Sequence, residues 1–179
     1  MRLCELVDNL IKPVAHDYTI AYIYISPLNK ERLTSFKGVA GDSFKTLITQ
    51  YVRGWIGRNR DYYIALARMD AESRSISLSQ WGETVVRKGI EALPEYTKDI
   101  KEIPSTPLHK VELEPESVRF PINYIKLGTQ NLAFLRVGIH YDGRNPTDYI
   151  SRIVKEHLDR NWEKLYQPQV DAENFENWT

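Results

Sequence analysis

Four polar residues that could do chemistry lie close together late in the chain: His140, Asp142, Arg144 and Asp148. A histidine and a carboxylate two positions apart can ligate a metal or transfer protons. Asp142-Gly143 is also a typical turn pair, and Asp148 falls in the first turn of a predicted helix, where a carboxylate is stabilising. Only His140 then lacks a structural role. A hydrolase or nuclease of unrecognised type around His140 and Asp142 is therefore an alternative, and not the favoured one.

A second candidate group lies in the sequence YVRGWIGRNRDYY, residues 51–63. Its arginines, Arg53, Arg58 and Arg60, carry the charge that phosphates attract, and aromatic rings can stack on bases. The helix predicted here, however, places its tyrosine and tryptophan in a buried stripe. Cations at a helix end are also stabilising by themselves. A second alternative is therefore that these arginines bind nucleic acid or a nucleotide. They could equally contact a protein partner.

Other residues that support catalysis or metal binding are sparse. Cys4 is the only cysteine, which excludes an internal disulfide and a thiolate zinc site made by this chain alone. His16, His109 and His157 have no second ligand at metal-binding spacing, and no Gly-rich phosphate loop or nucleophile elbow occurs. We therefore expect no metal site, name no catalytic residue and no cofactor, and favour a binding function over an enzymatic one.

Composition predicts a folded protein of the cytoplasm. The 179 residues are 42% hydrophobic and 27% charged, which suits one domain over 1–167 with a flexible acidic tail over 168–179. Basic and acidic side chains number 24 each, so no net charge attracts nucleic acid or a membrane surface. The opening MRLCELVDNLIKPV carries two acidic residues, unlike a signal peptide, and no apolar run reaches the roughly 18 residues of a membrane span.

Hydrophobic periodicity predicts the elements that must position these groups. Apolar residues at helical spacing predict helices over 3–14, 44–55, 82–93 and 146–165. Ser43 or Asp42 caps the second of these and Gly57 ends it, whereas Asn145 caps the last. Apolar alternation and β-branched runs predict strands over 18–25, 32–42, 61–70, 73–80, 118–124 and 132–139, with an irregular loop over 94–109.

The order of these elements resembles a GAF domain, a sensory fold. The resemblance depends on the opening helix, the pair TIAYIYIS and RLTSFKGVAG, and above all SVRFPINYIKLGTQNLAFLRVGIHYDGRNPTDYISRIVKEHL. It implies an α+β domain with a central antiparallel sheet, helices packed on one side, and a loop-covered face. The cysteine that holds a bilin in photosensory members has no counterpart here, since Cys4 lies in the opening helix.

This resemblance implies a sensory or regulatory domain that binds a small molecule or a protein partner. We expect it to act as a homodimer through its opening or terminal helix. The ligand would lie between the sheet and the irregular loop. The residues expected to bind it are Tyr22, Tyr24, Tyr124, Phe134, Arg136 and His140.

Overall fold

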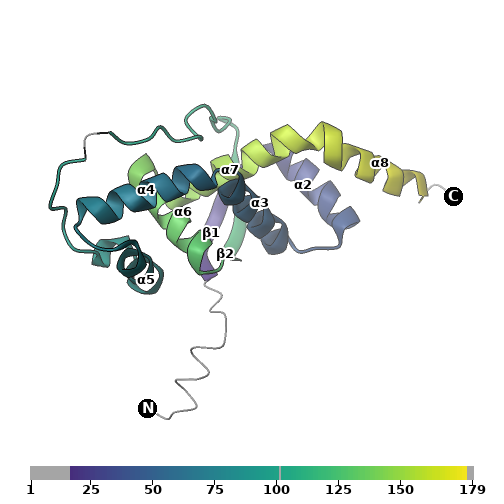
Figure 1. Cartoon of the computed structure of the whole chain (residues 1–179). Helices are drawn as coiled ribbons and strands as arrows, with labels where there is room; N and C mark the ends of the chain where they lie inside the picture. The colour runs from purple at the N-terminus through teal and green to yellow at the C-terminus, as the bar shows by residue number, and fades with distance from the viewer. Residues whose placement is uncertain (1–16, 101, 177–179) are drawn as a thin grey trace, which may run out of the picture.

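The computed structural model describes residues 17–100 and 102–176 (Figure 1). Over these residues the chain is mostly helical and contains two strands. The elements in chain order are β1 (Asp17–Ile25), α2 (Pro27–Ala40), α3 (Phe44–Arg58), α4 (Arg60–Ser73), α5 (Leu78–Lys88), the 3-10 turn η1 (Ile90–Ala92), β2 (Val118–Lys126), α6 (Thr129–Asp142), α7 (Pro146–Asn161), the π-helical turn η2 (Trp162–Tyr166) and α8 (Gln167–Glu176).

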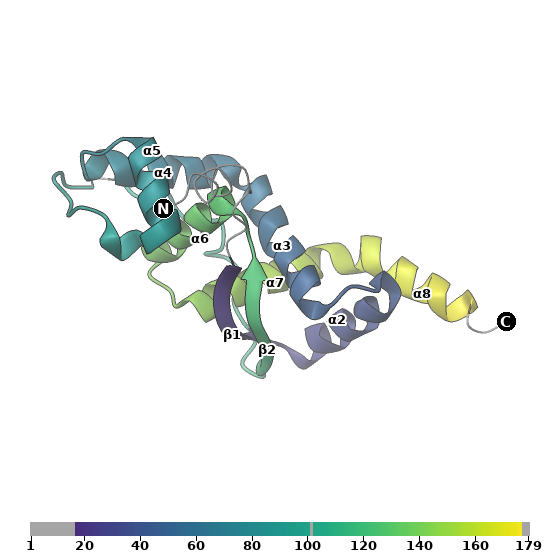
Figure 2. The same ribbon diagram turned by 90° about the horizontal axis from the view of Figure 1, so that it is seen from below.

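The two strands form one antiparallel pair, which is the whole of the sheet within the described residues. Its register places Ile23 opposite Phe120 and Tyr18 opposite Ile125. α7 packs against β1 and α3 packs against β2, and Figure 2 shows α7 passing behind both strands. The remaining helices extend to either side, with α4, α5 and α6 at one end and α2 and α8 at the other (Figure 1).

The predicted GAF-like fold with a central antiparallel sheet is wrong. The segments 32–42, 61–70 and 132–139, each predicted as a strand, lie mainly in α2, α4 and α6, and 73–80 contains no strand. A short apolar run has the same composition in a buried helix as in a buried strand. Tertiary packing decided in favour of the helix here, because α4 and α6 bury these runs against each other.

The helix predicted from the 44–55 stripe is confirmed. The Ser43 hydroxyl caps α3 by accepting a hydrogen bond from the Thr46 amide at 3.2 Å. Tyr51 and Trp55 are buried, as predicted. Gly57 does not end the helix, because α3 continues to Arg58. The strand expected at 18–25 and the one expected at 118–124 are also confirmed as β1 and β2.

The last long helix begins as predicted. Asn145 caps α7 by accepting from the Asp148 amide at 3.2 Å, with Pro146 in the first turn. Its inward stripe ends earlier than expected, because the π-helical turn η2 shifts the register, and Leu165 is 52% exposed. Residues 167–176 then form α8, which packs against α2. The helix predicted over 3–14 lies outside the described residues.

Three helices approach one another closely at Gly138 of α6. A β-carbon there would lie 2.6 Å from the Tyr149 hydroxyl and 2.7 Å from the Tyr63 ring, so only glycine fits without a shift. The Tyr63 and Tyr149 hydroxyls are 2.7 Å apart, and Trp55 Nε1 donates to Tyr63 at 2.9 Å. This hydrogen-bonded chain connects α3, α4 and α7 inside the apolar core. None of the helices in the described part of the chain is long and apolar enough to cross a membrane.

Candidate functional site

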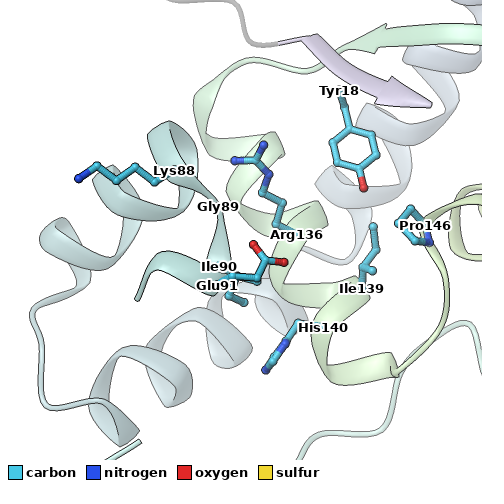
Figure 3. Close-up of a pocket in the computed structure, with 9 residues that line it drawn as sticks. All are labelled: Tyr18, Lys88, Gly89, Ile90, Glu91, Arg136, Ile139, His140 and Pro146. Carbon is cyan, nitrogen blue, oxygen red and sulfur yellow. The ribbon is translucent and has the colours of Figure 1, made fainter. Parts of the chain in front are cut away.

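A cavity of about 320 Å³ opens beside β1, where α5 ends and α7 begins (Figure 3). Tyr18 enters it from β1, and Arg136 and His140 enter from α6. The full lining is Tyr18, Lys88, Gly89, Ile90, Glu91, Arg136, Ile139, His140 and Pro146. Cavities of this size are at the lower end of the range for small-molecule sites.

The turn after α5 brings two charged residues to this cavity. α5 ends at Lys88 because Gly89 adopts a φ of 94°, a conformation that costs glycine little. The chain then enters η1 and presents Glu91 at the cavity. Neither Lys88 nor Glu91 forms an ion pair with any described residue. The Glu91 carboxylate is therefore available to a ligand, whereas Figure 3 shows the Lys88 side chain pointing away from the cavity.

Arg136 of α6 binds the last turn of α5 beside the cavity. Its guanidinium donates hydrogen bonds to the backbone carbonyls of Val85 and Val86, the latter at 3.2 Å. These carbonyls belong to the last turn of α5, where a cation complements the helix dipole. Burial raises the pKa of the Tyr18 hydroxyl, against the opposing effect of Arg136, and Glu91 adds to the rise. The guanidinium and the carboxylate thus both act on the same cavity hydroxyl.

A buried carboxylate, Asp70 of α4, organises the side of the site behind His140. Its Oδ1 accepts hydrogen bonds from the hydroxyls of Tyr96 at 2.9 Å and Tyr141 at 2.6 Å. Its Oδ2 accepts from Arg74 Nε at 2.9 Å and Trp81 Nε1 at 2.8 Å. Asp70 has no exposed surface. We call these five residues the Asp70 network.

The protonation of this network follows from its electrostatics. Burial raises the pKa of Asp70, but its four hydrogen bonds together outweigh burial and hold the pKa below its ordinary value. Asp70 is therefore ionised and acts only as an acceptor. The Arg74 guanidinium lies 4.1 Å from the centre of the Tyr96 ring, which keeps that ring against the network.

The Asp70 network also determines the tautomer of His140. His140 Nε2 lies 2.9 Å from the Tyr96 hydroxyl. A tyrosine hydroxyl has one proton, and Tyr96 gives it to Asp70, so its oxygen can only accept from His140. Nε2 must therefore carry the hydrogen of this bond. When the ring is neutral, its remaining lone pair is on Nδ1, so His140 offers a ligand an acceptor held in a fixed orientation.

The structure brings together two of the six predicted ligand-binding residues. Arg136 and His140 both line the cavity. Tyr22 and Tyr24 lie on β1 with their hydroxyls 3.4 Å apart, and Arg119 lies 4.6 Å from the centre of the Tyr22 ring. None of these three residues lines the cavity.

The other two predicted ligand-binding residues lie in different surroundings. Tyr124 of β2 packs beneath the Lys45 ammonium, which lies 4.2 Å from its ring centre. Phe134 of α6 is in the core, 6% exposed and stacked on Tyr63. The prediction placed both on a sheet face, whereas α6 is a helix that directs Phe134 inward.

The His140 and Asp142 side chains do not form an acid–base pair. His140 is bound to Tyr96, whereas Asp142 forms an ion pair with Arg144 at 2.8 Å. Arg144 also lies 3.3 Å from Asp148, so the remaining members of the predicted group neutralise one another. Over residues 17–100 and 102–176 no group of three or more histidine, cysteine or acidic side chains is placed to hold a metal ion.

The predicted arginine group is divided between different neighbours. Arg58 pairs with Glu156 of α7 at 3.6 Å, and Arg60 donates to Gln130 of α6 at 3.0 Å. Arg53 is exposed on α3. Two of the three cations are thus engaged within the fold, and the neighbouring aromatic side chains are buried. These three arginines therefore do not form one surface with aromatic rings on which bases could stack.

A buried histidine, His157 of α7, lies apart from the cavity. Its ring stacks on Tyr51 with centroids 3.9 Å apart, and its Nε2 lies 2.5 Å from the Tyr166 hydroxyl. Its Nδ1 is buried and has no hydrogen-bond partner among the described residues. Burial, together with the charges of Arg58 and Arg160, lowers the pKa of His157 to about 4. His157 is therefore neutral in the native protein.

We expect this histidine to destabilise the fold in acid. Its pKa is about 4 in the native state against 6.5 ordinarily, so its neutral form stabilises the fold above pH 6.5. That stabilisation should be lost as pH falls from 6.5 to about 4, at a cost of up to about 3 kcal/mol. Urea melts of the wild type and of His157→Phe across this pH range measure the loss of unfolding free energy. Equal pH slopes in the two proteins would contradict the prediction, and His109→Gln, at an exposed histidine, is the control.

Sequence reasoning missed several residues of the site, of which four matter most here: Asp70, Tyr96, Lys88 and Glu91. Asp70 had a detectable signal, because it continues the helical spacing of Tyr63, Leu66 and Ala67 on one buried face of α4. The other three had none that we can identify.

Comparison of the chain with protein-family models, with curated proteins and with solved structures gives no match. Function is therefore inferred from the chemistry of the site alone.

Proposed function

We propose that this chain is a small-molecule-binding domain with a sensory or regulatory role in the cytoplasm, and that its ligand binds in the cavity beside His140. The observation that carries the proposal is the combination of an open cavity with a histidine whose other nitrogen is committed to the Asp70 network. A binding site needs a few polar groups in fixed orientation among apolar surface. The cavity supplies that surface from Ile90, Ile139 and Pro146.

Binding is favoured over catalysis by the chemistry of the lining. It contains no serine, threonine or cysteine that a neighbouring base could activate. His140 has its Nε2 bound to a tyrosine, and the nearest predicted acid partner, Asp142, is paired elsewhere. The homodimer stays a prediction. The apolar stripe of α7 is already used within the chain, which leaves the opening helix as the predicted interface.

A fragment screen followed by nuclear magnetic resonance of the histidine rings tests the proposal. We expect a ligand that raises the melting temperature and perturbs the His140 ring signals, since binding to the native state alone stabilises it by about 2.7 kcal/mol at a hundred times Kd. His140→Ala should abolish both effects. His109→Ala should retain them, because His109 bonds only to a nearby carbonyl in the irregular segment. A screen whose hits leave His140 unperturbed, or that has no hits, would overturn the proposal.

A further inference from the structure

The charges of the cavity carry an inference about the class of ligand. Lys88 and Glu91 line the same cavity and form no ion pair with each other or with any other described residue. Arg136 is engaged by two backbone carbonyls and no carboxylate, so its positive charge is also not neutralised. The cavity thus presents both signs of charge, separated from each other.

The geometry points to a zwitterionic ligand, and we propose an α-amino acid with an aliphatic side chain. In this arrangement Glu91 receives the ammonium group, and Arg136 receives the carboxylate. The inference rests on the proposed function, because it assigns the ligand of the same cavity.

The hydrogen-bonding capacity of the lining supports this assignment. An ammonium group has three donors and no acceptor, and a carboxylate has only acceptors. Glu91 and His140 Nδ1 are the acceptors that suit the first, because His140 Nε2 is occupied by Tyr96. Arg136 and the Tyr18 hydroxyl are donors that suit the second. Figure 3 shows Tyr18 coming from β1, Glu91 from η1, and Arg136 and His140 from α6, whereas the Lys88 side chain points away from the cavity.

Ligands of one charge fit less well. A simple carboxylate would be attracted by Arg136 but repelled by Glu91, and a simple amine would meet the reverse. A molecule that carries both groups balances the charges of Arg136 and Glu91. The apolar lining of Ile90 and Ile139 suits an aliphatic side chain, and a cavity of about 320 Å³ is large enough for a free amino acid.

Isothermal titration of the full chain with L-leucine and two analogues tests the inference. The analogues are 4-methylpentanoate, which lacks the ammonium group, and 3-methylbutylamine, which lacks the carboxylate. We expect L-leucine to bind at least about tenfold more tightly than either analogue. L-valine and L-isoleucine, titrated in parallel, should show the same preference over their own analogues.

Charge-neutralising variants assign the two ends of the ligand. Glu91→Gln should weaken L-leucine about tenfold and leave 4-methylpentanoate unchanged or tighter, and Arg136→Gln should weaken L-leucine and 4-methylpentanoate together. Glu95→Gln and Lys98→Gln, at exposed positions outside the cavity lining, are the matched controls and should change nothing.

The outcomes separate the inference from the proposed function. Equal affinity for L-leucine and 4-methylpentanoate would overturn the zwitterionic ligand. So would the absence of binding by any aliphatic amino acid while a screening hit perturbs His140. Either result would leave the proposed binding cavity intact. No ligand of any class at His140 overturns both.

Discussion

Replacing Asp70 with alanine is expected to lower the free energy of unfolding by about 3–5 kcal/mol, as for removal of one partner from a buried ion pair. The substitution leaves the Arg74 guanidinium, which is 7% exposed, without its carboxylate. It also removes the acceptor of Trp81 Nε1, Tyr96 and Tyr141. Guanidinium-induced unfolding followed by circular dichroism measures the loss. A decrease below about 1 kcal/mol would mean that the network is solvated.

Two further variants separate the charge of Asp70 from its surroundings. Asp70→Asn keeps the size and one acceptor oxygen but loses the charge, so its effect should lie between those of wild type and alanine. Glu72→Ala, at an exposed position of the same helix, should stay within about 0.5 kcal/mol of wild type. Hydrogen exchange at Thr97 and Lys98 adds a local probe, because both amides bond to the Ser73 carbonyl beside the network. Asp70→Ala should accelerate it, since Tyr96 then no longer holds this segment.

The same residue explains why α4 was predicted as a strand. The buried positions of this helix follow helical spacing: Tyr63, Leu66, Ala67, Asp70 and Ala71. Asp70 interrupts that stripe when only apolar residues are counted, and the adjacent pair Tyr62 and Tyr63 suggests strand composition. A buried carboxylate conflicts with local hydrophobic patterning because its partners come from other segments. The prediction of a strand therefore failed at Asp70, the residue on which the Asp70 network is centred.

α6 was predicted as a strand for a different reason. Its residues from Leu132 to Leu135 are all buried, so the segment has no polar face and no helical period. A continuous apolar run of this length predicts a buried strand equally well. α3 and the first turns of α7 were predictable because each has one apolar face, one polar face and a capping side chain. The capped amphipathic helices α3 and α7 were recoverable from the sequence, whereas α6, which begins with a continuous buried run, was not.

The candidate site was predictable in part. His140 stood out because nothing in its turn explained it, and Arg136 was named beside it on a predicted strand. Their proximity in the cavity comes from one turn of α6. Lys88 and Glu91 join them only because Gly89 redirects the chain after α5. The sequence does not show which charged side chains from separate segments remain without an ion pair after folding. The cavity could therefore be identified only from the structure.

Trp55 gives the second large effect that we expect, because it begins the hydrogen-bonded chain that connects α3, α4 and α7. The indole is 5% exposed, and its Nε1 donates to the Tyr63 hydroxyl at 2.9 Å. Trp55→Ala removes this donor and leaves a cavity in the core, which together should cost about 3–5 kcal/mol of unfolding free energy. Denaturant melts measure it, and a loss under about 1 kcal/mol would show that the surrounding core closes over the deleted ring.

Trp55→Phe distinguishes packing from the hydrogen bond. Phenylalanine retains most of the apolar contact but cannot donate, so the Tyr63 hydroxyl keeps only its bond to Tyr149. We expect a loss of about 1–3 kcal/mol, which is smaller than that of Trp55→Ala because no large cavity forms. Gln50→Ala, on the exposed face of α3, is the matched control and should change stability by less than about 0.5 kcal/mol. If the phenylalanine variant were as unstable as the alanine variant, the hydrogen bond and not the buried volume would account for the contribution of Trp55.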